Sequence, residues 1–215
     1  MGKRHRSIGQ RNRQPRTYKI KRMKKIMFSD KFCLTQAVLS GIKTMTRRVL
    51  KEGTPLGNWE ETAKYLPYKV GRVVAIAQSY NDIYNELEEQ GDDVSNDWWI
   101  PSFEGKVLDT LAGYKNKMFV RSDLMKHHIK ITDVKVERLQ DISDEDCLRE
   151  GIRYYHSSDK RWSNNSGYGY HIPKNGLHLF DTPYEAFANL FERISGKGTW
   201  ESNPWVAAYE FKLID

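Results

Sequence analysis

Apolar and polar positions alternate along much of the chain with the two-residue period of β-strands, interrupted by stretches with the period of a helix. The strand pattern predicts short strands at residues 26–28, 44–49, 70–77 and 118–120. Apolar residues between 32 and 39 follow helical spacing, with Asp30 as the expected N-cap and Gly41 as the stop. These elements indicate an α+β fold.

A longer strand pattern runs from Ile129 to Leu139, and its apolar positions change parity between Ile131 and Val134. Such a change indicates a β-bulge, because one extra residue moves the following side chains to the other face of the strand. Residues 204–214 carry a last strand with alternating apolar positions. Since a bulged strand bends, we expect a curved sheet or a small barrel.

Two helices are expected to flank this sheet. Ser143 is a typical N-cap, acidic residues follow it in the first turn, and Gly151 marks the end of a short helix. Residues 184–194 place apolar side chains at helical spacing, which predicts an amphipathic helix packed on the sheet.

Residues 81–117 and 154–182 are rich in Asn, Asp, Ser, Gly, Tyr and Trp, which is typical of surface insertions. We expect them to form walls or lids rather than core. Aromatic side chains in them would either stack on bases or anchor a long loop: Trp98, Trp99, Trp162, Tyr168, Tyr170 and His171.

Composition narrows the class of protein. No run approaches the roughly 20 apolar residues of a membrane span, and the basic N-terminus lacks the apolar core of a secretory signal. Cys33 and Cys147 lie far apart and outside metal-binding spacings, which favours reduced thiols. His127 and His128 are adjacent, so their side chains diverge on a strand. We expect a cytoplasmic protein without membrane, metal or cofactor.

Charge divides the chain into two parts. Residues 1–25 hold 11 of the 35 Lys and Arg residues and no acid, whereas the rest has 24 basic against 28 acidic residues, a net charge of −4. The tail is expected to be disordered and suited to contacts with a phosphate backbone. The alternative is that the native product begins at Met23 or Met27. The tail alone therefore does not indicate the function of the protein.

Several segments together resemble the ASCH family of the PUA-like superfamily. They are residues 41–48 (GIKTMTRR), 68–75, 131–142, 146–152, the helix at 187–194, and 203–206 with the strand that follows. The resemblance covers about half of the chain and omits the tail and both insertions. It implies a PUA-like small β-barrel with flanking helices over residues 26–215, and recognition of RNA or a modified nucleoside. Such proteins also occur in bacteriophage and bacterial genomes.

Some small ASCH-like proteins are 4-acetylcytidine amidohydrolases, and their Gly-x-Lys-x-x-Thr-x-Arg segment is matched by residues 41–48. The resemblance implies Lys43 as proton acceptor, Thr46 as nucleophile and Glu150 as proton donor. A Thr hydroxyl needs a neighbouring base, and a Lys serves as one only when its pKa is lowered. On a straight strand Lys43 and Thr46 face opposite ways, so cooperation requires a turn between them.

The expected binding set is Gly41, Lys43, Thr46, Arg47, Arg48 and Glu150. Arg47 and Arg48 would lower the Lys43 pKa, stabilise an oxyanion or hold a phosphate, and the sequence leaves these roles open. Structural roles remain as alternatives, with Lys43 near a helix end, Thr46 as a β-former and Glu150 in an ion pair.

Three functions follow from these residues. The leading one is binding of an RNA base or modified nucleoside. The second is hydrolysis of an acylated cytidine in the same pocket. The third is a protein-interaction module using the tail and insertions, for which substitutions in the pocket would leave function intact.

Overall fold

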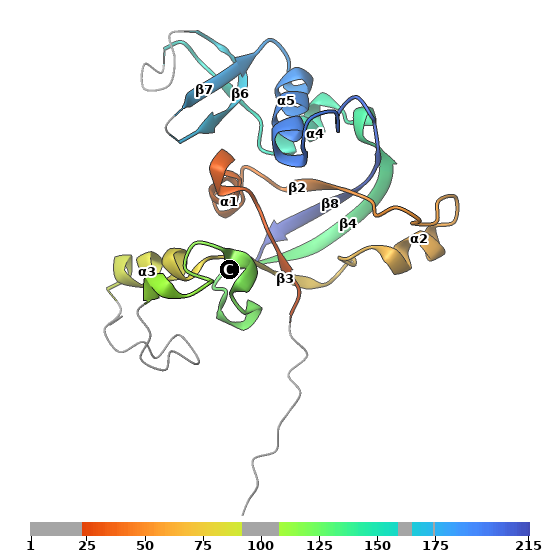
Figure 1. Ribbon diagram of the computed structural model, residues 1–215. Coiled ribbons are helices and arrows are strands. Elements are labelled where there is room, and N and C mark those ends of the chain that lie inside the picture. Colours follow the sequence, from red (N-terminus) through yellow and green to blue (C-terminus); the bar gives the residue numbers. More distant parts are fainter. Residues whose placement is uncertain (1–22, 92–107, 159–164, 174) are drawn as a thin grey trace, which may run out of the picture.

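The computed structural model describes residues 23–91, 108–158, 165–173 and 175–215. Most of the expected tail, and Trp98, Trp99 and Trp162 of the expected insertions, lie outside the described residues. The described residues form a mixed α+β fold with five α-helices and two β-sheets (Figure 1).

The larger sheet has five strands in the order β1-β3-β4-β8-β2. Their bounds are β1 Lys25–Ile26, β3 Val73–Ile76, β4 His128–Arg138, β8 Trp205–Leu213 and β2 Met45–Val49. β1 pairs in parallel with β3, and the other neighbours are antiparallel. The long β4 and β8 form the centre of the sheet and extend across the molecule (Figure 1).

The pairing of β4 with β8 shifts register between Ile131 and Asp133. This confirms the bulge expected from the change of parity. The sheet ends at β1 and β2, so within the described residues it is open, and the expected closed barrel is not found there. The two residues of β1 offer few backbone groups for a ladder to a further strand.

A second sheet contains β5 Arg153–Tyr155, β6 Gly167–Ile172 and β7 Gly176–Phe180. The expectation that residues 154–182 stay outside the core was wrong here, because Tyr170 and Ile172 are buried in the main core. The strand pattern of β6 is hard to detect in the sequence because Gly167 and Gly169 alternate with its core residues.

The N-terminal helical segment differs from the sequence prediction at its start. Asp30 begins a 3-10 turn, Asp30–Phe32, and the N-cap of α1 (Leu34–Leu39) is Cys33, with a left-handed φ of 53°. Gly41, with φ of 73°, follows the helix and reverses the chain, as expected for a stop.

Each of the other helices begins after a side chain that caps it. α4 (Asp144–Arg149) begins after Ser143, whose side chain accepts a hydrogen bond from the Asp146 N–H. α5 (Pro183–Ser195) is capped in the same way by Thr182. α2 (Trp59–Tyr65) follows Asn58, and α3 (Tyr80–Glu89) follows Ser79 in a capping box.

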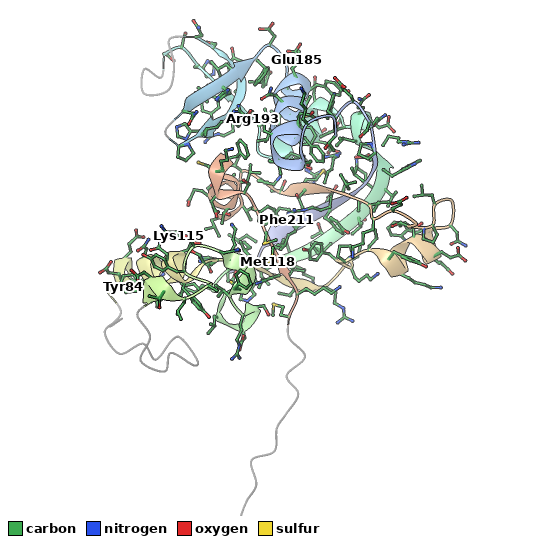
Figure 2. All side chains as sticks on the ribbon, viewed as in Figure 1. Tyr84, Lys115, Met118, Glu185, Arg193 and Phe211 are labelled. Atoms are coloured by element: carbon green, nitrogen blue, oxygen red, sulfur yellow. The ribbon has the colours of Figure 1, made fainter. Side chains whose placement is uncertain are left out.

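The five-stranded sheet separates two cores. Val74 and Ile76 of β3 belong to the main core, whereas Ala75 belongs to a smaller core with Ile83 and Leu87 of α3. Accordingly Glu185 of α5 and Tyr84 of α3 lie at opposite ends of the molecule in Figure 2. Part of the insertion expected at 81–117 is therefore a packed helix.

Met118 does not lie in a strand as predicted. Residues Lys117–Phe119 form a 3-10 turn, because the Asn116 side chain accepts the Met118 N–H and caps the turn. Among the described residues, no helix combines the length and apolar character that crossing a membrane requires.

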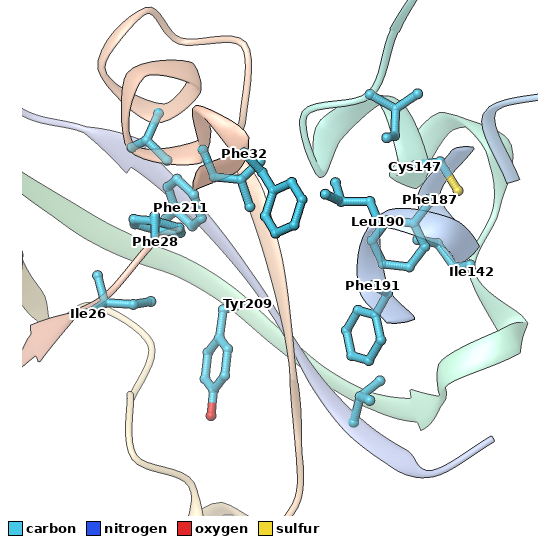
Figure 3. Close-up of a cluster of buried hydrophobic side chains, with 14 of the residues drawn as sticks. Ile26, Phe28, Phe32, Ile142, Cys147, Phe187, Leu190, Phe191, Tyr209 and Phe211 are labelled. Carbon is cyan, nitrogen blue, oxygen red and sulfur yellow. The ribbon is translucent and has the colours of Figure 1, made fainter. Parts of the chain in front are cut away.

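The main core combines aliphatic side chains of the sheet with a group of aromatic ones. Figure 3 shows Phe28, Phe211 and Tyr209 on one side and Phe187, Leu190 and Phe191 on the other. Cys147 of α4 lies near Phe187 of α5 and is 0% exposed. Around this core, α5 packs against α4, β6 and β7, and α4 contacts β2.

We expect Cys147 to resist alkylation in the native protein. Burial raises the pKa of its thiol to about 12, so the reactive thiolate is nearly absent at pH 8. Mass spectrometry after iodoacetamide treatment should find Cys147 modified only in denaturant, while the half-buried Cys33 serves as the internal comparison. Rapid native labelling of Cys147 would contradict the packing of α4.

Candidate functional site

The candidate site begins with the chain between α1 and β2. After Gly41 turns the backbone, the Lys43 N–H donates to the Ala37 carbonyl at 2.9 Å. The Thr44 N–H then donates to the Arg149 carbonyl at 2.9 Å, which ties the segment to the end of α4. These bonds hold Lys43 in the turn before β2, so it escapes the strict alternation of a strand.

Within β2, Thr46 and Arg48 share one face because side chains alternate along a strand. Thr46 lies opposite Tyr209 in the ladder to β8, so these side chains face the main core together. The requirement for a turn between Lys43 and Thr46 is met, since both line the same cavity.

Glu150 follows α4 and meets Lys43 in the protein interior. The Lys43 Nζ lies 2.5 Å from the Glu150 Oε2 and also donates to the Glu150 backbone carbonyl at 2.7 Å. The two residues are 2% and 4% exposed. An ammonium group and a carboxylate so deeply buried are tolerated only as a pair.

Arg47 points away from Thr46 and is surrounded by carboxylates. Its side chain is 0% exposed and lies 2.6 Å from Asp146, 2.7 Å from Glu137 and 3.3 Å from Glu150. These acids hold its pKa above the ordinary value despite the opposing effect of burial. Arg47 therefore contributes by fixing the Glu150 carboxylate, and its donors are occupied.

Burial lowers the pKa of Lys43, and this effect outweighs the opposing attraction of Glu150. The charges of Arg48 and Arg47 act in the same direction as burial. The Thr46 hydroxyl, on a residue that is 5% exposed, has no hydrogen-bond partner among the described residues. A weakened base and a free hydroxyl thus line one cavity.

This cavity, the Lys43 pocket, has a volume of about 370 Å³. Its polar lining residues are Lys43, Thr46, Arg47, Arg48, Glu150 and Ser195. Its apolar wall is formed by Phe28, Leu34, Phe187, Leu190, Phe191 and Ile194. Concave sites of this size with few polar groups are typical of small-ligand pockets.

The structure thus brings five residues of the expected set to the pocket: Lys43, Thr46, Arg47, Arg48 and Glu150. Gly41 does not line the pocket and acts through the turn. The sequence did not indicate that Glu137 and Asp146 surround Arg47, or that α5 forms part of the wall. The helical pattern of residues 184–194 indicated only a core-facing surface.

The described aromatics of the second expected insertion have packing roles. Tyr170 is 2% exposed, stacks on His178 and donates to the Asn189 side chain at 2.5 Å. Tyr168 packs edge-on against Tyr154. Of the two roles expected for these aromatics, stacking on bases or anchoring a long loop, Tyr170 therefore has the anchoring role.

The adjacent histidines form separate contacts, His127 with Glu86 at 2.6 Å and His128 with Asp215. Within the described ranges, no group of three or more His, Cys, Asp or Glu side chains is arranged to hold a metal ion. In comparisons with known proteins, no family model, no curated protein and no solved structure matches the chain.

Proposed function

We propose that the Lys43 pocket binds a nucleoside, free or as part of RNA. The observation that carries this proposal is the gathering of Lys43, Thr46, Arg48 and Glu150 on one side of a cavity with an apolar, partly aromatic wall. A nucleobase has polar edges and apolar faces. It therefore suits a pocket with hydrogen-bonding groups on one side and Phe and Leu side chains on the other.

Membership of the ASCH family, with its PUA-like fold, is part of the same proposal. It is supported by the curved five-stranded sheet with α4 and α5 beside it, and by the position of residues 41–48 at a cavity. The openness of the described sheet is the point at which this chain departs from the expected small barrel.

A second function, hydrolysis of an acylated cytidine, is favoured by the state of Lys43. A lysine with a lowered pKa serves as a base more readily than one in water, and the Thr46 hydroxyl on the same pocket is free to lose its proton. In this reaction Lys43 accepts the Thr46 proton, and the Thr46 oxygen attacks the acyl carbon. The C–N bond then breaks as Glu150 protonates the departing amino group.

Water completes the cycle by hydrolysing the acyl–Thr46 ester to a carboxylic acid. The contact of 2.5 Å between Lys43 and Glu150 suits this chemistry, because it holds the proton acceptor and the proton donor side by side at the pocket. Burial favours the neutral form of the Lys43 amine, which is the form that accepts a proton.

We expect Thr46→Val to separate the two functions. The change keeps the shape of the side chain and removes its hydroxyl. If the pocket hydrolyses 4-acetylcytidine, cytidine release measured by chromatography falls by about a hundredfold or more, and Thr46→Ser restores part of it. Wild-type activity should rise as the pH approaches the lowered pKa of Lys43, because only its neutral amine accepts the Thr46 proton.

If there is no hydrolysis, calorimetry with cytidine and 4-acetylcytidine decides about binding. Lys43→Met should then weaken binding by about tenfold or more, because it removes a charged donor from the pocket. Lys212→Gln, an exposed change on β8 outside the pocket, is the matched control. Absence of both turnover and binding in the wild type would refute the proposed function.

A further inference from the structure

A second cavity lies beside the Lys43 pocket and shares Arg48 and Val49 with it. It has a volume of about 310 Å³ and lies between α2, the end of β2 and β8. Four cations line it, Lys24, Arg48, Lys51 and Lys64, and no acidic residue is among its lining residues. We call it the basic cleft.

The concentration of positive charge in the basic cleft contrasts with the rest of the body. Residues 26–215 carry more acidic than basic side chains. The nearest ion-paired cations, such as Arg47, are matched by carboxylates, whereas no ion pair of Lys51 or Lys64 occurs in the described part of the chain. Within the described ranges, Lys24 donates to the Pro67 carbonyl, at 2.6 Å, and to no carboxylate. The cleft therefore attracts an anion.

Two buried polar atoms at the cleft lack hydrogen-bond partners in the described residues, the Tyr209 hydroxyl and the Arg48 Nε. Tyr209 is 0% exposed, and Figure 3 shows its hydroxyl pointing away from Phe28 and Phe211. The Tyr68 backbone amide lies near this hydroxyl without forming a hydrogen bond of normal geometry. An unpaired buried donor is unfavourable, so a ligand that accepts from it gains affinity.

The chemistry of these groups selects the ligand. The ammonium groups and the Arg48 Nε–H are donors only, and the Tyr209 O–H is free to donate. A ligand that satisfies them is negatively charged and accepts hydrogen bonds from several directions, as a tetrahedral phosphate does. Its position beside the Lys43 pocket, with Arg48 at both cavities, matches a phosphate attached to a nucleoside.

We propose that the basic cleft binds the phosphate group of the nucleoside held in the Lys43 pocket, so that the ligand is a nucleotide or an RNA residue. This inference rests on the proposed function, because it takes the occupant of the Lys43 pocket to be a nucleoside. Tyr65 of α2 lines the cleft and is 62% exposed, and Trp59 of the same helix is 50% exposed. Exposed aromatics beside cations are suited to stacking of a neighbouring base in a strand.

Calorimetry at low salt tests the phosphate site with four probes. They are 4-acetylcytidine, its 5′-monophosphate, its 3′-monophosphate and a short single-stranded RNA that contains it. We expect a phosphorylated probe to bind about tenfold more tightly than the nucleoside, and the gain to shrink as salt is added. A gain with a monophosphate indicates a mononucleotide ligand, and a gain with the strand alone indicates RNA.

Two variants link this gain to the basic cleft. Lys51→Gln combined with Lys64→Gln, and separately Tyr209→Phe, should reduce the gain to about twofold while nucleoside binding is unchanged. Lys212→Gln is again the control. Tyr209→Phe is the sharper variant, because removing an unpaired buried hydroxyl should leave thermal stability equal or higher. A lower stability would point to a structural role and count against the inference.

The remaining outcomes are also decisive. If the nucleoside binds and no phosphorylated probe binds more tightly, the inference fails and the proposed function stands. If a phosphorylated probe still binds more tightly than the nucleoside in both variants, the phosphate is bound elsewhere, and the inference also fails. If no probe binds to the wild type, both proposals fail.

Discussion

Replacing Arg47 with Met should lower the free energy of unfolding by about 3–5 kcal/mol, the range for removing one partner of a buried charge network. The Arg47 side chain is fully buried and lies within 3.3 Å of carboxylates of Glu137, Asp146 and Glu150. Met has a similar length and fills much of the space. The loss therefore reports mainly the three carboxylates that are left without their common partner.

Urea denaturation at pH 7 measures this effect, with Arg121→Met as the control. Arg121 also pairs with a carboxylate, that of Asp123, but both side chains are about 40% exposed. The control should cost much less than Arg47→Met, as is usual for exposed pairs. Equal losses in the two variants would mean that water compensates for the missing guanidinium and that Arg47 does not organise the site.

The same variant should change the acid dependence of stability. Burial favours the neutral form of Asp146, but Lys135 and Arg47 outweigh it and lower the Asp146 pKa below 3.8. Its stabilising contribution is thus fully present above that value and is lost as the pH falls through the lower folded value. In Arg47→Met this contribution of Asp146 should be smaller. The wild type and Arg47→Met should therefore differ less in stability at pH 2 than at pH 7.

Gly169→Ala is the second change with a large expected effect. A Cβ atom at Gly169 of β6 would lie 1.8 Å from the His178 carbonyl oxygen on β7. Because the obstacle is backbone, no side-chain rotation relieves it and the strands must separate. We expect a loss of more than about 3 kcal/mol, above ordinary overpacking.

Gly167→Ala is the matched control on the same strand, since its Cβ would lie 2.9 Å from the Phe180 carbonyl oxygen. It should be destabilising, but clearly less so than Gly169→Ala. Thermal unfolding of both variants measures the difference, and similar melting temperatures would contradict the described pairing of β6 with β7. The effect should reach the main core, because Tyr170 of β6 is buried there.

Much of the main sheet was predictable from the sequence because its signals are local. The change of parity between Ile131 and Val134 predicted the bulge, and Ser143 and Gly151 predicted the limits of α4. The strand β6 was missed because glycines interrupt its pattern, although Tyr170 and Ile172 are core residues. The 3-10 turn at Lys117–Phe119 was predicted as a strand because residues 118–120 are all apolar. Their apolar character does not reveal that Asn116 caps a turn.

For the site, the sequence alone determined the chemical types, through the resemblance of residues 41–48 and the position of Glu150. Only the tertiary structure decided their roles. It surrounds Arg47 with three acids and places Lys43 against Glu150. Among the described residues it leaves the Thr46 hydroxyl without a hydrogen-bond partner. It also gathers Lys24, Lys51 and Lys64 around Tyr209. Burial and charge pairing depend on contacts between residues far apart in the chain, and periodicity along the sequence does not contain them.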